Sequence, residues 1–104
     1  MAPATVMVLY PQTPTSTFNE EYYLATHMPL AAKHWTKHGL KNYKVSKLNA
    51  DGPYAYSSVM EWESYEGFQA AIKDAGTKEI MEDVPNFSSE KAVLVHGSVI
   101  GGSG

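Results

Sequence analysis

The residues best suited to chemistry lie within 18–39, where aromatic rings and imidazoles alternate at helical spacing. A step of four residues places Tyr23 and His27 on one side of a helix, and Tyr22 lies on a neighbouring side. An imidazole at this position could exchange a proton with an acidic C–H or O–H group near neutral pH. A tyrosine hydroxyl beside it could stabilise the oxyanion that results. We therefore take His27 as the candidate general base or acid and Tyr22 or Tyr23 as the candidate oxyanion donor.

The structural alternative for His27 stays open at this point. A single histidine on a mostly apolar helix face is more often a hydrogen-bonded core residue than a catalyst, and a spacing pattern is only a hypothesis until its surroundings are known.

Two further histidines, His34 and His38, are four residues apart, a spacing at which two imidazoles can bind one metal ion. No glutamate stands between them in the arrangement of known zinc motifs, and no third ligand follows at a recognisable spacing. Their place near the end of a helix favours an interaction with the helix dipole, so we expect no metal. His96, near the end of the chain, is a secondary candidate for substrate binding.

The chain has enough large apolar side chains to line a pocket for a flat ligand. Our candidates for its walls are Trp35, Met60, Trp62 and Phe87, and Phe87 stands in a loop where it could act as a lid. Most aromatic residues pack in cores or interfaces whatever the function. The sequence has no Ser-His-Asp order, glycine-rich phosphate loop or paired carboxylates, which argues against hydrolases, kinases and glycosidases.

The amino-acid composition excludes several classes of ligand and binding partner. The 104 residues carry a net charge of −3, and all 8 basic side chains are lysine. Because arginine is the favoured partner of phosphate, its absence argues against nucleic acid and nucleotides. Cysteine is absent, so disulfides and thiolate chemistry are excluded. No apolar run is long enough to span a membrane and no secretory signal precedes the first strand, so we expect a cytoplasmic protein without a membrane partner.

The pattern of apolar residues predicts six main elements. Residues 5–10 read as a strand, followed by a helix that begins with a capping box formed by Thr17 and Glu20 and is divided by Pro29 near His27. Residues 40–48 and 54–62 alternate as strands do. A helix capped by Ser64 should end at Gly76, a short helical turn should begin at Thr77, and residues 91–100 should form the last strand.

This order is βαββαβ, the ferredoxin-like arrangement of the α+β class, with a four-stranded antiparallel sheet and helices on one face. The other face keeps apolar residues from the first and last strands, so it needs a cover. We expect a homodimer in which two sheet faces stack. Residues 101–104 read as a flexible tail or linker outside a single domain of residues 1–100.

Four motifs occur in an order that resembles the EthD-like family of the dimeric α+β barrel superfamily. They are VLYP at 8–11, F-x-x-x-YY-x-x-x-H-x-PL at 18–30, DGPY at 51–54 and DVPNF at 83–87. The resemblance covers nearly the whole chain. It implies a ferredoxin-like homodimer, forming a dimeric α+β barrel, with a pocket in each subunit between sheet and helices. The histidine of the family's motif falls on His27, and its paired tyrosines fall on Tyr22 and Tyr23.

The resemblance implies a small-molecule enzyme with cofactor-free acid–base chemistry on an aromatic or polyketide-like carbonyl compound, as a cyclase, dehydratase, decarboxylase or isomerase. The alternative is a protein that binds a small apolar ligand without turnover, such as a stress-associated protein. Related barrel families include haem enzymes, but a chain without arginine has few groups for haem propionates, so we expect no cofactor.

Overall fold

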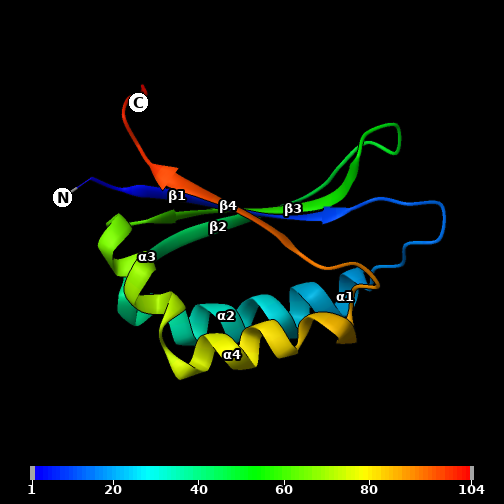
Figure 1. Cartoon of the computed structure of the whole chain (residues 1–104), viewed down its shortest axis with the longest axis horizontal. Helices are drawn as coiled ribbons and strands as arrows, with labels where there is room; N and C mark the ends of the chain where they lie inside the picture. The colour runs from blue at the N-terminus through cyan, green and yellow to red at the C-terminus, as the bar shows by residue number, and fades with distance from the viewer. Residues whose placement is uncertain (1, 104) are drawn as a thin grey trace.

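The computed structural model describes residues 2–103, which form one antiparallel sheet with every helix on the same face (Figure 1). The strands lie in the order β2-β3-β1-β4. This confirms the ferredoxin-like α+β fold. The elements along the chain are β1 (Ala4–Pro11), α1 (Glu20–Tyr22), the π-helical turn η1 (Tyr23–His27), α2 (Met28–Trp35), the 3₁₀ turn η2 (Thr36–His38), β2 (Leu40–Lys47), β3 (Tyr54–Trp62), α3 (Tyr65–Ile72), α4 (Ala75–Glu82), the 3₁₀ turn η3 (Val84–Asn86) and β4 (Val93–Ser98).

The register of the sheet decides which side chains face the helices. Val6 lies opposite Met60 on β3 and opposite His96 on β4, and Val8 lies opposite Ser58 and Leu94. Partners in an antiparallel pair share a face, so these residues all point toward the helix layer. The period-two pattern expected for residues 54–62 is confirmed.

Two clusters of buried side chains fill the space between sheet and helices. In the first, the fully buried Trp62 packs against Trp35 and Phe68, with ring centroids 5.7 Å and 5.4 Å away. The second holds Tyr10, Tyr23 and Phe87 near the start of the helix layer, with the Phe18 ring packed against it. The site described below lies where these clusters meet.

The first helix starts later than the sequence suggested. Asn19, and not Thr17, is its N-cap, because the Asn19 side chain accepts a hydrogen bond of 3.1 Å from the backbone N–H of Tyr22. The backbone N–H of Thr17 instead donates to Ser89 Oγ at 2.8 Å. Thr17 is thus held by the segment before β4 and cannot cap the helix.

The division of this helix near Pro29 is confirmed, and it takes the form of one widened turn. The backbone N–H of Met28 donates to the carbonyl of Tyr23, five residues back, and Pro29 follows in the first turn of α2. Proline lacks an N–H and crowds the preceding turn, so an enlarged turn before it relieves the conflict. The same turn carries Tyr23 and His27 into the interior, where both are buried.

The second helical region divides earlier in the sequence than expected. Ser64 caps α3 as predicted, accepting a hydrogen bond of 3.0 Å from the N–H of Gly67. However, α3 ends at Ile72, and Asp74 caps α4 through the N–H of Gly76 at 2.8 Å. The predicted helix end at Gly76 and the predicted start at Thr77 are therefore wrong. A glycine stands at position 76 because a Cβ there would overlap the imidazole of His34.

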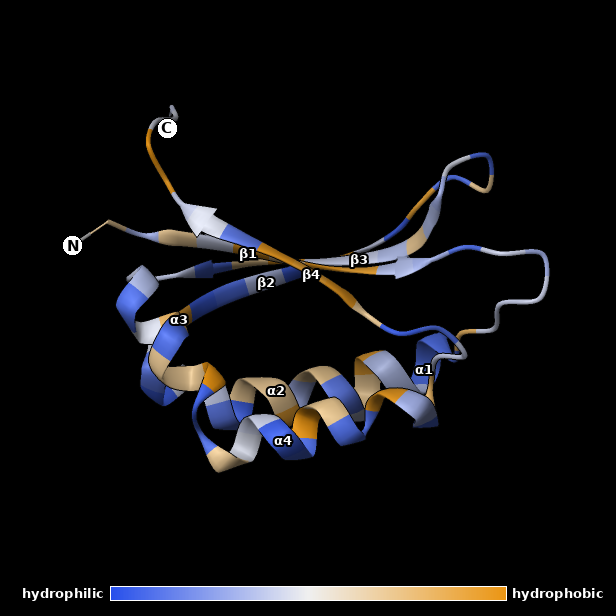
Figure 2. Cartoon of the chain, viewed as in Figure 1, coloured by the Kyte–Doolittle hydropathy of each residue, from blue (hydrophilic) through white to orange (hydrophobic). Residues whose placement is uncertain are grey.

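Within residues 2–103, no helix or strand covers the face of the sheet away from the helices (Figure 2). Met7, Leu9 and Val59 are partly exposed there, and Val95 beside Met7 is 48% exposed. In the part of the chain that the structure describes, no helix is long and apolar enough to cross a membrane.

Candidate functional site

A histidine–carboxylate pair lies in the interior of the helix layer. His27 Nδ1 is 2.9 Å from Asp83 Oδ2, and the two side chains are only 5% and 12% exposed. His27 ends the π-helical turn η1, and Asp83 follows α4 as its C-cap. The pair therefore joins two helical segments that are 56 residues apart in the sequence.

The other carboxylate oxygen of Asp83 also accepts hydrogen bonds. Oδ1 accepts hydrogen bonds from the Tyr22 hydroxyl at 2.6 Å and from Asn86 Nδ2 at 2.9 Å. Burial by itself would raise the pKa of Asp83, but the hydrogen bonds from Tyr22, Asn86 and His27 outweigh burial and lower it. Asp83 is thus an anion near neutral pH and fixes the proton of His27 on Nδ1.

The other ring nitrogen of His27, Nε2, makes no hydrogen bond among the described residues and can exchange a proton with a ligand. Burial lowers the pKa of His27 below its ordinary value, an effect that is larger than the opposing influence of Asp83. The imidazole is therefore neutral at pH 7 with a basic Nε2. If Nε2 takes a proton, the carboxylate of Asp83 stabilises the imidazolium that forms.

His27 lines a small cavity between the sheet and the helices. The cavity has a volume of about 70 Å³, and its walls include Tyr23, Trp35, Met60 and Ser58. The Tyr23 ring stacks on the His27 ring with centroids 5.3 Å apart. Burial raises the pKa of Tyr23, more than the neighbouring hydroxyls of Tyr10 and Ser58 lower it, so this hydroxyl keeps its proton and can donate a hydrogen bond.

The structure brings four of the predicted site residues to this cavity and leaves four outside it. His27, Tyr23, Trp35 and Met60 line it. Tyr22 does not line the cavity. Its hydroxyl donates a hydrogen bond to Asp83, and this bond raises the pKa of Tyr22. Tyr22 therefore supports the carboxylate and is not placed to be an oxyanion donor.

The other three residues belong to the surroundings of the cavity. Trp62 is buried in the core behind it. Phe87 is 4% exposed and packs on the His27 ring with centroids 4.4 Å apart, so it supports the histidine from outside the cavity. His96 lies near α3, where its Nδ1 is 2.8 Å from the Tyr65 hydroxyl.

The sequence interpretation missed Asp83. It lies in the DVPNF motif, but acidic residues at helix ends are usually solvated, and its position opposite His27 depends on how two distant helices pack. A signal was present in the motif itself, because a carboxylate followed by an asparagine three residues later forms its own hydrogen bond here.

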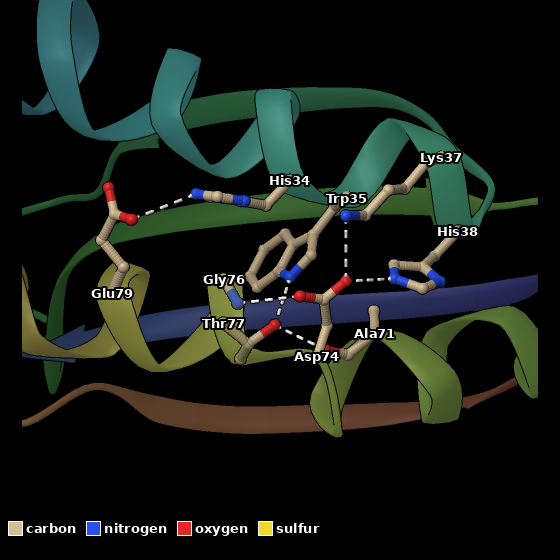
Figure 3. Close-up of polar contacts among 9 residues, drawn as sticks. All are labelled: His34, Trp35, Lys37, His38, Ala71, Asp74, Gly76, Thr77 and Glu79. Atoms are coloured by element: carbon tan, nitrogen blue, oxygen red, sulfur yellow. Dashed lines mark hydrogen bonds and ion pairs between the residues drawn. The ribbon is translucent and has the colours of Figure 1, made fainter.

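The two remaining histidines of the helix layer pair with carboxylates and not with each other (Figure 3). His38 Nε2 is 2.7 Å from Asp74 Oδ2, and Lys37 Nζ is 3.2 Å from the same oxygen. Hydrogen bonds from His38, from the N–H of Gly76 and from Lys37 lower the pKa of Asp74. His34 lies 3.4 Å from Glu79. Among residues 2–103, no cluster of three or more potential ligands could hold a metal ion.

Comparisons with known proteins give the family context for this geometry. No protein-family model and no curated protein matches the sequence. Among solved structures, the chain is similar to an EthD-like protein from Ralstonia eutropha JMP134, with 25% identity, a TM-score of 0.82 and coverage of 96% of this chain and 94% of the other.

Two more distant structures share the fold alone. A dimeric ferredoxin-like protein of unknown function from Thermobifida fusca has 16% identity and a TM-score of 0.62, with 94% of this chain and 92% of the other covered. SnoaB from Streptomyces nogalater, a cofactor-independent oxygenase, has 11% identity and a TM-score of 0.66, with 100% and 97% covered.

Proposed function

Because the chain is an EthD-like protein by its motifs and its structural similarity, we propose that it is a small-molecule enzyme that performs cofactor-free acid–base chemistry. The substrate is an aromatic or polyketide-like carbonyl compound, and the reaction is of the cyclase, dehydratase, decarboxylase or isomerase kind. His27 is the base that removes a proton from carbon or oxygen, and Tyr23 donates a hydrogen bond to the oxyanion.

One observation carries this proposal: a buried histidine lines an apolar cavity while a partly buried carboxylate is hydrogen-bonded to its Nδ1. An imidazole nitrogen that has no hydrogen-bond partner in the protein can exchange a proton with a ligand. Here the hydrogen bonds of the described residues engage Nδ1 alone. A base that is neutral, oriented and shielded from water is suited to proton transfer.

The choice of cofactor-free chemistry is supported by the fold neighbour SnoaB, whose name describes a cofactor-independent oxygenase. The overall similarity is distant and does not transfer a substrate or a reaction. It does support the view that this fold can catalyse a reaction without a cofactor.

We expect the protein to accelerate exchange of the α-hydrogens of a compact benzylic ketone such as 2-indanone with deuterium from heavy water. Removal of an α-proton by His27 gives an enolate that takes deuterium when it returns to the ketone, so exchange reports proton abstraction whatever reaction follows. Proton NMR measures the loss of the α-hydrogen signal against a buffer blank. If the benzylic ketone shifts the His27 signals on binding without any acceleration of exchange, the alternative of a non-catalytic ligand-binding protein is the better description.

We also propose that the protein is a homodimer in which the uncovered sheet faces stack. The support is the strip of partly exposed apolar side chains at the centre of that face, together with the dimeric state named for the Thermobifida protein.

Replacing Val95 by aspartate should dissociate this dimer, because each charge would be buried against the partner sheet without a compensating group. Sedimentation velocity at micromolar concentration should show a dimer for the unchanged protein and a monomer for Val95→Asp. Leu24→Asp is the matched control, since Leu24 is also exposed, at 53%, but lies in the helix layer. A monomeric unchanged protein would contradict the proposal.

A further inference from the structure

We propose that small molecules reach His27 through an entrance between α3–α4 and the edge strand β4, and that this entrance admits uncharged aromatic rings while excluding charged ones. The inference rests on the proposed function in taking the cavity beside His27 as the substrate site. It adds the route to the cavity, the residues that form this route, and the requirement that the substrate be uncharged.

Three side chains mark the entrance. Ile72 at the end of α3, Met81 in α4 and Leu94 in β4 all line the cavity, and they are 47%, 51% and 45% exposed. A side chain that contacts the cavity on one side and water on the other lies at its mouth. No comparable set occurs among the described residues at the opposite wall of the cavity, where Met60 and Ser58 of β3 are buried.

The two rims of this entrance are held by different contacts. The start of α4 is fixed to η2 by the contacts of Asp74 with His38 and Lys37 (Figure 3). The end of α4 is fixed by the contact of Asp83 with His27. The opposite rim is β4, which pairs with β1 alone at the edge of the sheet (Figure 1). Both rims are therefore held at the backbone, and a wider entrance requires movement of its side chains.

The present volume of the cavity makes such movement necessary. At about 70 Å³ it is smaller than the roughly 150 Å³ cavity that accommodates benzene in a protein core. Met81 is unbranched and flexible, so its rotation together with a shift of Leu94 enlarges the space without moving the helix backbone. We infer that these two side chains part when a ring enters.

The walls also decide which ligands can be buried. No Asp, Glu or Lys side chain lines the cavity, and its polar groups come from His27, Tyr10, Tyr23, Ser58 and Thr77. Thr77 is already engaged, because its hydroxyl donates to the carbonyl of Ala71 at 2.5 Å and accepts from Trp35 Nε1 at 2.8 Å. A carboxylate or ammonium group would lose its hydration without gaining an ionic partner, whereas a neutral ring with one hydroxyl would not.

The test compares two phenols that differ only in the group opposite the hydroxyl: p-cresol with a methyl group and 4-hydroxybenzoate with a carboxylate. NMR titrations of the full chain follow the signals of His27, Met81 and Leu94. We expect p-cresol to shift these signals and to bind at least about ten-fold more tightly than 4-hydroxybenzoate, a ratio worth roughly 1.4 kcal/mol. Equal affinities would overturn the selection of uncharged rings.

The route is tested by placing a charge at the mouth. Leu94→Asp, and independently Met81→Glu on the other rim, should weaken p-cresol binding at least about ten-fold, whereas the exposed control Leu24→Asp should bind as the unchanged protein does. If either mouth variant binds p-cresol normally while remaining folded by its NMR spectrum, the proposed entrance is wrong. These are binding measurements, so their failure leaves deuterium exchange by the unchanged protein as a separate test of the proposed function.

Discussion

Replacing His27 by alanine should lower the rate of enzyme-catalysed deuterium exchange or turnover by about 10²- to 10⁴-fold, the usual contribution of a positioned general base. The loss arises because His27 supplies the only imidazole that the described residues place on the cavity wall, and the neighbouring Tyr23 hydroxyl, with its raised pKa, stays protonated and cannot act as the base. The effect should fall on the rate and not on binding, since the alanine leaves the apolar walls of the cavity in place.

The matched control is His96→Ala. His96 also contacts an aromatic ring and a tyrosine hydroxyl, with Nδ1 2.8 Å from Tyr65, but it lies outside the cavity. Its replacement should leave the exchange rate within about two-fold, because it touches no residue of the His27–Asp83 pair. An unchanged rate for a folded His27→Ala protein, or an equal loss in both variants, would rule out His27 as the base.

The fold could be predicted from the sequence because local patterns decide most of it. The alternation of apolar residues along 54–62 determines the register of this strand when one face of the sheet is buried. A shift of register by one residue would expose Met60 and Trp62. The division of the helix at Pro29 follows from the missing N–H of proline. These features depend on neighbours in the sequence and not on how distant segments meet.

The predictions that were wrong depend on contacts between distant segments. Gly76 was interpreted as a helix end, the commonest role of glycine there, but its lack of a Cβ is needed to accommodate His34 from α2. Thr17 has the sequence of a cap but is held by Ser89. In both cases a tertiary contact 42 or more residues away overrides a local preference.

The candidate site was predicted only in part for the same reason. Spacing and the family motif identified His27 and Tyr23, which share one helical face. The pairing of His27 with Asp83 joins η1 to the end of α4, and the assignment of Tyr22 to the carboxylate follows from that pairing. Spacing groups Tyr23 with His27, but no sequence spacing indicates that the adjacent Tyr22 will donate a hydrogen bond to Asp83.

Replacing Asp83 by asparagine should lower turnover at least about ten-fold and move the acid side of its pH profile to lower pH. The rate falls because the asparagine no longer stabilises the imidazolium and no longer requires the proton of neutral His27 to lie on Nδ1. Asp83 is a positioning residue, since it acts on the substrate through His27.

The pH shift has a defined sign. Catalysis needs neutral His27, so the rate rises as pH increases through the pKa of this histidine. Burial already lowers that pKa, and Asp83 opposes the effect of burial. Loss of the carboxylate removes the opposition, the pKa falls further, and the acid limb of the profile moves to lower pH in Asp83→Asn.

Rates measured from pH 4 to pH 9 test this shift of the acid limb. The control is Asp74→Asn, which removes the carboxylate paired with His38 at 2.7 Å and should leave the acid limb in place. A lower rate with an unmoved acid limb would mean that Asp83 only holds the two helical segments together, because loss of packing alone lowers the rate without removing a charge from beside His27.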